Sequence, residues 1–289
     1  LNDIFAVQDE LTREIVGALK VRLTAADKER LAHKPKVNLD AYNLFLRARE
    51  KSWRASRSEN VEVRKLLAAA IAIEPSYAAA HASIAFSHIN DYANGWTDDP
   101  ERTLQTAIET AERVVEMDDQ DADAHFALAA ACAFTRDFDR ATAEIGRCLA
   151  LAPNHPHGRL SAGHFQTFAG NPAAAIEAID DYMRQDPHYA DLTLQFLAEA
   201  HVSLRQFEDA IAALKQRLER DPGSKTAQIL LASCYGNLGK IDEARAAWAK
   251  VQEIDPGFDI ESRRALMPFK NSADFDIRVE GIRKAGLLN

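Results

Sequence analysis

A regular spacing of prolines constrains the fold of this chain more than any other feature. Four prolines recur at intervals of 34, 35 and 34 residues, and a small residue stands 12 positions before each of them. The pairs are Ala141 and Pro153, Ala175 and Pro187, Ala210 and Pro222, and Ala244 and Pro256. A small side chain lets two helices approach closely, and a proline ends a helix and redirects the chain. The period therefore predicts a row of stacked helix pairs.

The stretch from Lys225 to Pro256 shows the repeating unit most clearly. Apolar residues follow the i, i+3, i+4, i+7 spacing of an amphipathic helix over roughly 226–238 and again over roughly 242–254. Gly239 separates the two patterns, and glycine readily takes the positive φ that ends a helix. Pro256 stops the second pattern.

Six residues of this stretch stand where the 34-residue tetratricopeptide pattern has Leu, Gly, Tyr, Ala, Phe and Pro: Leu231, Ala232, Tyr235, Ala244, Trp248 and Pro256. The chain therefore resembles a tetratricopeptide-repeat (TPR) array. The resemblance implies an all-α fold, a right-handed solenoid of about six helix pairs with flanking helices.

We expect three parts along the chain. Residues 1–38 hold N-terminal helices, over 3–22 and 25–33, that do not fit the repeat and form a junction to an upstream domain. Residues 39–257 form the solenoid, with a loose first unit and regular units from 122 onward. Residues 258–289 form C-terminal capping helices, the last of them ended by Gly286.

The second unit is about ten residues longer than the others, and we place the extra residues near 93–100, between its two helices. An insertion at this point of a repeat projects from the solenoid. Trp96 lies in it, either as a binding contact or folded back onto its own repeat, and we favour the second interpretation.

Composition excludes several classes of function. Hydrophobic residues make up 47% of the chain, charged residues 27%, and the net charge is −9 without a basic stripe, so we expect no nucleic-acid partner. No apolar run approaches the roughly 18 residues of a membrane span, and no signal peptide is present. Three widely spaced cysteines predict free buried thiols and a cytoplasmic protein. The chain starts at Leu1 without a methionine, which suggests a piece of a longer protein.

No pattern in the sequence indicates catalysis. The run 236–240 (GNLGK) lacks the P-loop spacing, and G-x-S-x-G and HExxH do not occur. His155, His157 and His164 lie near one another, but no cysteine or carboxylate cluster completes a metal site. His81 and His125 are expected to be packing residues. We therefore predict no catalytic residue, no metal and no cofactor in this segment.

In the TPR family the first helix of each repeat lines a concave groove that binds a peptide or protein. Carried onto this chain, the groove positions are Phe86, Asn90, Phe126, Phe134, His157, Leu160, His164, Phe168, Gln195, Glu199, Ser203, Ile229, Ser233 and Asn237. Chaperone-binding relatives hold a terminal carboxylate with Lys, Arg and Asn in the groove. From the second unit onward, the fifth and ninth positions of the first helices carry neither Lys nor Arg.

We therefore expect no binding of an acidic C-terminal peptide. The four phenylalanines of the groove suggest an apolar peptide or helix as ligand. The alternative is that some of these rings pack between neighbouring repeats, and the residues do not decide between the two. A homodimer is also possible.

Both ends resemble a particular branch of large bacterial signalling proteins, in which an output domain precedes a TolB-like domain and TPR repeats. The resemblance rests on residues 3–23 and 39–50 and, for the branch whose output domain is a class III adenylate cyclase, on residues 268–287. It implies a regulatory and protein-interaction region for cyclic-AMP signalling. Two alternatives stay open: the TPR region of a winged-helix transcriptional regulator, and a stand-alone scaffold or oligomerisation module.

Overall fold

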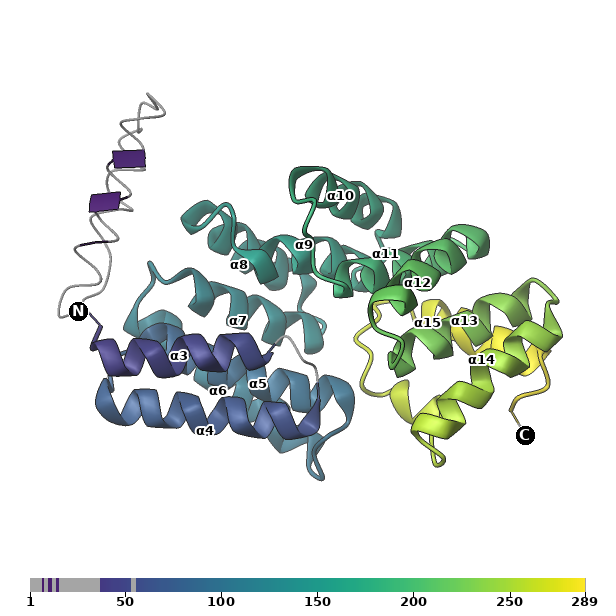
Figure 1. Cartoon of the computed structure of the whole chain (residues 1–289), viewed down its shortest axis with the longest axis horizontal. Helices are drawn as coiled ribbons and strands as arrows, with labels where there is room; N and C mark the ends of the chain where they lie inside the picture. The colour runs from purple at the N-terminus through teal and green to yellow at the C-terminus, as the bar shows by residue number, and fades with distance from the viewer. Residues whose placement is uncertain (1–6, 8–9, 12–13, 16–36, 53–55, 289) are drawn as a thin grey trace. The chain divides into compact units, whose positions relative to one another are not determined.

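The computed structural model describes residues 7, 10–11, 14–15, 37–52 and 56–288 (Figure 1). It divides into two compact units, residues 1–38 and 39–289. In the first unit residues 7, 10–11 and 14–15 are helical. The rest of the helices expected over 3–22 and 25–33 lies outside the described residues.

The second unit is built of helices, and its described residues contain no strand. Six successive pairs are formed by α3 (Leu39–Ser52) and α4 (Arg57–Ile73), α5 (Ala78–Asn94) and α6 (Pro100–Met117), α7 (Ala122–Phe134) and α8 (Phe138–Leu151), α9 (Pro156–Phe168) and α10 (Pro172–Gln185), α11 (Leu192–Ser203) and α12 (Phe207–Arg220), and α13 (Lys225–Asn237) and α14 (Ile241–Ile254). A 3₁₀ turn (Glu261–Arg263) and α15 (Ser272–Lys284) follow. The predicted all-α array of six helix pairs is confirmed.

The residues that define the period have the expected roles. The small residues Ala141, Ala175, Ala210 and Ala244 are each at most 1% exposed. Each of the four prolines follows the end of its helix by two positions. Gly239 has a φ of +72° between α13 and α14, as its place in the turn requires.

Within this unit each helix pair packs against the next pair along the array. We call α3, α5, α7, α9, α11 and α13 the first helices, and their partners the second helices. Each first helix packs on its second helix, and from α5 to α13 the successive first helices also contact one another. The first helices therefore share a continuous face, along which the groove residues of the sequence lie.

The extra residues of the second pair mostly lengthen its helices. Helices α5 and α6 have 17 and 18 residues, against 13 and 14 in α7 and α8. Gly95, with a φ of +67°, ends α5, and Asp99 caps α6, so only residues 95–99 connect them. The expected projecting loop is thus a short connection, and Trp96 in it is half-buried.

Cys132, Cys148 and Cys234 are free and buried, as predicted. Burial raises the pKa of the Cys148 and Cys234 thiols to about 12, so they are not reactive thiolates at neutral pH. Among the helices of the described part of the chain, none combines the length and the apolar character that crossing a membrane demands.

Candidate protein-binding groove

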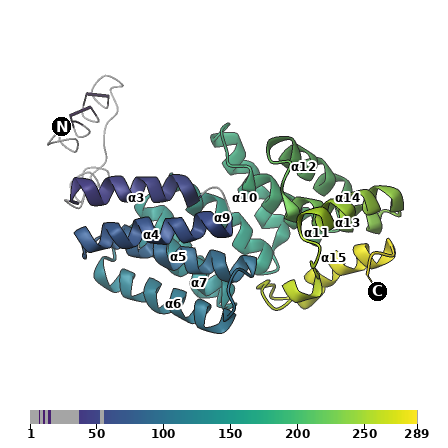
Figure 2. The ribbon, with the colours of Figure 1, turned by 60° about the horizontal axis from the view of Figure 1, so that its bottom comes forward.

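The C-terminal segment crosses the first helices instead of adding a further layer to the stack. Helix α15 packs mainly against α13, the first helix of the last pair, and also against α11, the first helix of the pair before it (Figure 2). We call the side of the first helices that residues 263–284 contact the inner face. This is the face that the TPR resemblance assigns to ligands.

A buried ion pair joins α15 to α11. Arg278 donates from Nη2 to Oε2 of Glu199 over 3.3 Å, and the two side chains are 5% and 3% exposed. Gln195 donates to the other carboxylate oxygen at 3.1 Å, and Nε2 of His164 lies 3.2 Å from Oε2. Burial alone would raise the pKa of Glu199, but Arg278 and His164 outweigh it and lower this pKa to about 2. The carboxylate is therefore charged and fully partnered.

Two glycines bring the backbones of α13 and α15 together. A Cβ atom on Gly281 would overlap the carbonyl oxygen of Ser233, and one on Gly236 would overlap that of Gly281. Asn237 donates to the carbonyl oxygen of Ile277 at 3.0 Å and accepts from Lys284 at 3.1 Å. Only glycine fits at either of these two helical positions in this arrangement.

The segment before α15 contacts the inner face at earlier repeats. The backbone N–H of Lys270 donates to the carbonyl oxygen of Phe168 at 2.8 Å, and the Phe168 and Phe269 rings meet edge to face at 5.2 Å. Earlier in the same segment, Arg263 donates to the carbonyl oxygen of Ala93, at the end of α5. We call residues 258–288 the tail. The tail thus runs past the ends of α5 and α9 and reaches α11 and α13.

At the N-terminal half of the inner face, a pocket is lined by residues of α3, α4, α5, α7 and α9. We call it the N-terminal pocket, and its lining includes Arg49, Phe86, Asn90, Asp123, Phe126 and His157. The Phe86 and Phe126 rings are 4.8 Å apart, and His157 stacks on Phe126 at 5.5 Å. The pocket therefore combines an aromatic floor with one cation and one carboxylate.

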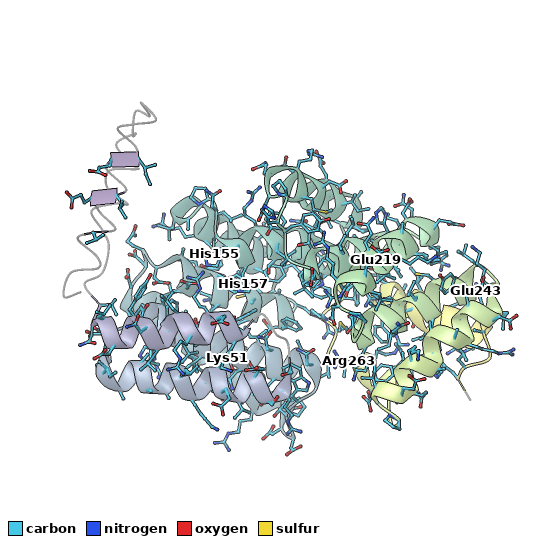
Figure 3. The ribbon with its side chains drawn as sticks, viewed as in Figure 1. Lys51, His155, His157, Glu219, Glu243 and Arg263 are labelled. Atoms are coloured by element: carbon cyan, nitrogen blue, oxygen red, sulfur yellow. The ribbon has the colours of Figure 1, made fainter. Side chains whose placement is uncertain are left out.

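Two histidines stand at the start of α9, where Figure 3 labels them: His157 lines this pocket and His155 is the N-cap of the helix. Nδ1 of His155 accepts from the Gly158 N–H at 2.9 Å, so Nε2 carries the proton and donates to Asp123 at 3.0 Å. Although burial favours the neutral acid, the bond from His155 holds the pKa of Asp123 below its usual range. Burial and the neighbouring His155 lower the pKa of His157 to about 4, so this ring is neutral at pH 7.

The predicted groove residues fall into three groups. Phe86, Asn90, Phe126 and His157 line the N-terminal pocket. Tail contacts involve Phe168, Glu199, Ser233 and Asn237. The others take part in internal packing or helix hydrogen bonds: Phe134, Leu160, His164, Gln195, Ser203 and Ile229. Ring contacts between repeats occur at all four phenylalanines, and their binding of a ligand stays a prediction.

Sequence reasoning missed Arg49, Asp123, Gly236, Arg278 and Gly281. Arg49 belongs to the first unit, whose register is loose. Asp123 is the second residue of α7, the position that His157 has in α9, but it was left out of the groove residues. A signal existed for Arg278, because it interrupts the apolar side of the last helix between Phe275 and Ile282. Glycines inside two helices were a second signal, since glycine there marks close backbone approach.

The comparisons with known proteins agree with this geometry. The tetratricopeptide-repeat family model matches residues 169–224 and 204–266. The pilus biogenesis factor PilW superposes with a TM-score of 0.52 at 18% identity, over 69% of this chain and 92% of that one. PilF of Pseudomonas aeruginosa gives 0.51 at 15% identity, over 76% and 93%. Residues 169–266 therefore carry tetratricopeptide repeats, and the array of helix pairs has the same fold as these solved structures.

One curated relative has a higher sequence identity to this chain than these solved structures. The chain is 38% identical over 141 residues to "Putative adenylate cyclase 3" of Rhizobium meliloti (strain 1021). The match covers 49% of this chain and 24% of that protein. The chain thus resembles a region that spans about a quarter of the relative's length.

Proposed function

We propose that this chain is the regulatory protein-interaction region of an adenylate cyclase, which acts in cyclic-AMP signalling. The observation that supports the proposal is the 38% identity over 141 residues to a protein named as an adenylate cyclase. The described residues offer an inner face on which a partner can bind. The chemistry then belongs to another domain of the same polypeptide, and this region controls it by binding a partner.

The mass of the native gene product, detected with an antibody against this segment, is the first test. We expect a product larger than 32.0 kDa by at least one domain of roughly 100–150 residues. The purified product should convert ATP to cyclic AMP, and deletion of residues 39–288 should change its regulated output. A product of 32.0 kDa, or a larger one that binds DNA and makes no cyclic AMP, would contradict the proposal.

We further propose that the N-terminal pocket takes an apolar side chain of a peptide or helix. Phe86 and Phe126 supply apolar surface, and the Arg49 cation is offset by the Asp123 carboxylate, so the pocket has no excess positive charge to attract an acidic ligand. Fluorescence anisotropy with two peptides tests this: one apolar and one with an acidic C-terminus. Submicromolar binding of the acidic peptide would overturn the proposal. The Phe86→Ala variant should bind the apolar peptide about tenfold more weakly than wild type.

A further inference from the structure

The inner face carries its own occupant in its C-terminal half. Phe275, Ile277, Val279 and Ile282 of α15 are each at most 6% exposed, so the helix is buried on more than one side. It achieves this against the first helices α11 and α13 and not by extending the stack. An amphipathic helix laid in a groove is also the way in which many proteins bind a partner.

The contact is specified by shape. Gly236 and Gly281 face each other where α13 and α15 approach, and a Cβ atom on either glycine would overlap the opposite backbone. A helix with a larger residue in place of Gly281 is therefore rejected. The site selects for a small residue at one defined position of its ligand.

The contact is also specified by charge. Glu199 is held by Gln195 and His164 on its own side of the groove, so its carboxylate is already oriented toward α15. Arg278 enters from the opposite side, three residues before Gly281. A buried ion pair contributes to the choice of partner and register more dependably than to stability. A ligand of this site accordingly needs an arginine three positions before its small residue.

Two polar atoms of this interface lack a hydrogen bond. Within the described residues, four buried side-chain atoms have no hydrogen-bond partner, and Oγ of Ser233 and Nε of Arg278 are two of them, beside Oγ1 of Thr167 and of Thr193. The Ser233 and Arg278 atoms belong to the contact between α15 and the groove. Buried polar atoms are normally paired, and unpaired ones weaken the contact that buries them.

We propose that the surface of α11 and α13 is a helix-binding site that α15 occupies in cis. A partner protein displaces α15 by presenting a helix with an arginine for Glu199 and a small residue opposite Gly236. The bound tail keeps the site closed until such a partner arrives. This inference does not depend on the cyclase proposal, because its experiment contains no cyclase.

A labelled peptide of residues 268–288, added to the full chain, serves as the probe partner. Fluorescence anisotropy compares wild type with Gly281→Ala, which disfavours docking of the chain's own α15. Gly146→Ala is the matched control, because it lies in helix α8 with no neighbouring atom within 4 Å of the new Cβ. We expect the Gly281→Ala chain to bind at least tenfold more tightly than wild type and control. Peptides carrying Arg278→Ala or Gly281→Ala should lose binding.

Equal weak binding by all three chains, with circular dichroism showing that Gly281→Ala is folded, would overturn the proposal. If Gly281→Ala does not fold, hydrogen exchange of wild type decides. The amides of α15 should then exchange at least tenfold faster than those of α13, and equal rates would show that α15 opens only on global unfolding. Light scattering that finds a dimer with exchanged α15 helices would also overturn it, since the occupant would be a second copy.

Discussion

In the N-terminal half of the inner face, Phe86, Phe126 and His157 line a pocket, whereas in the C-terminal half Phe168, Glu199 and Asn237 lie beneath the chain's own tail. Both sets come from the first helices of the repeats. The difference arises from residues 258–288, which lie outside the repeats. Repeat position therefore defines where a groove can form, and the flanking segment defines how much of it is free.

The two halves also differ in how far a carboxylate of the inner face is exposed to solvent. The C-terminal half contains a carboxylate fully enclosed by Arg278, His164 and Gln195. Asp123 of the N-terminal half is partly exposed, with a 30% accessible side chain, and is held by His155. A fully buried carboxylate tolerates no loss of its charged partner, whereas a partly exposed carboxylate keeps water as an alternative partner. The predictions below use this contrast.

The largest effect is expected for Arg278→Ala. It leaves Glu199 buried without its cation, which costs about 3–5 kcal/mol of unfolding free energy. Arg283→Ala on the exposed side of the same helix is the control and should stay within about 0.5 kcal/mol of wild type. Urea unfolding measures the unfolding free energy of both variants. Equal unfolding free energies would show that the ion pair does not stabilise the fold.

Gly236→Ala should have the next largest effect. Its Cβ would overlap the Gly281 backbone, and we expect a loss of roughly 2–3 kcal/mol, although alanine is the better helix former. The control Gly146→Ala should gain up to about 1 kcal/mol, because its Cβ meets nothing. If urea unfolding showed a gain for both variants, the helices would not approach as described.

The sequence predicted the stack but not the path of the tail. Period and small residues sufficed for the six pairs, because each repeat contacts mainly its neighbours. The docking of α15 depends on contacts such as Arg278 with Glu199, which are 79 residues apart, and local patterns carry no information about them. The Phe86 and Phe126 positions were predictable for the same reason as the stack, while Arg49 was missed in an irregular first repeat.

Acid should weaken the C-terminal half in a defined window. The pKa of Glu199 falls from an ordinary 4.5 to about 2 on folding, so its stabilisation is complete above pH 4.5 and is lost as the pH drops toward 2. Between pH 6 and pH 3 we expect a loss of about 2 kcal/mol from this group. Urea unfolding of Glu199→Gln at both pH values should lack this part of the loss. An identical pH response of wild type and variant would contradict the assignment.

The N-terminal half should respond to acid at higher pH, and the expected change is read from a chemical shift and not from unfolding free energy. His157 has its pKa lowered from 6.5 to about 4, so its contribution is complete above pH 6.5 and is lost as the pH falls toward 4. The imidazole resonances of His157, followed by NMR, should titrate near pH 4 in the folded chain and near 6.5 in urea. Titration near 6.5 in the folded chain would show that this ring is solvated.

The central claim is that α15 occupies the C-terminal half of the inner face within one molecule. Glycine-labelled protein tests it directly, because Gly236 and Gly281 approach closely enough for a nuclear Overhauser effect between their Hα atoms. We predict this signal in a sample in which every chain is labelled. In a mixed sample, we predict no such signal between a labelled chain and an unlabelled chain. No signal at all, or a signal only between different chains, would contradict the account.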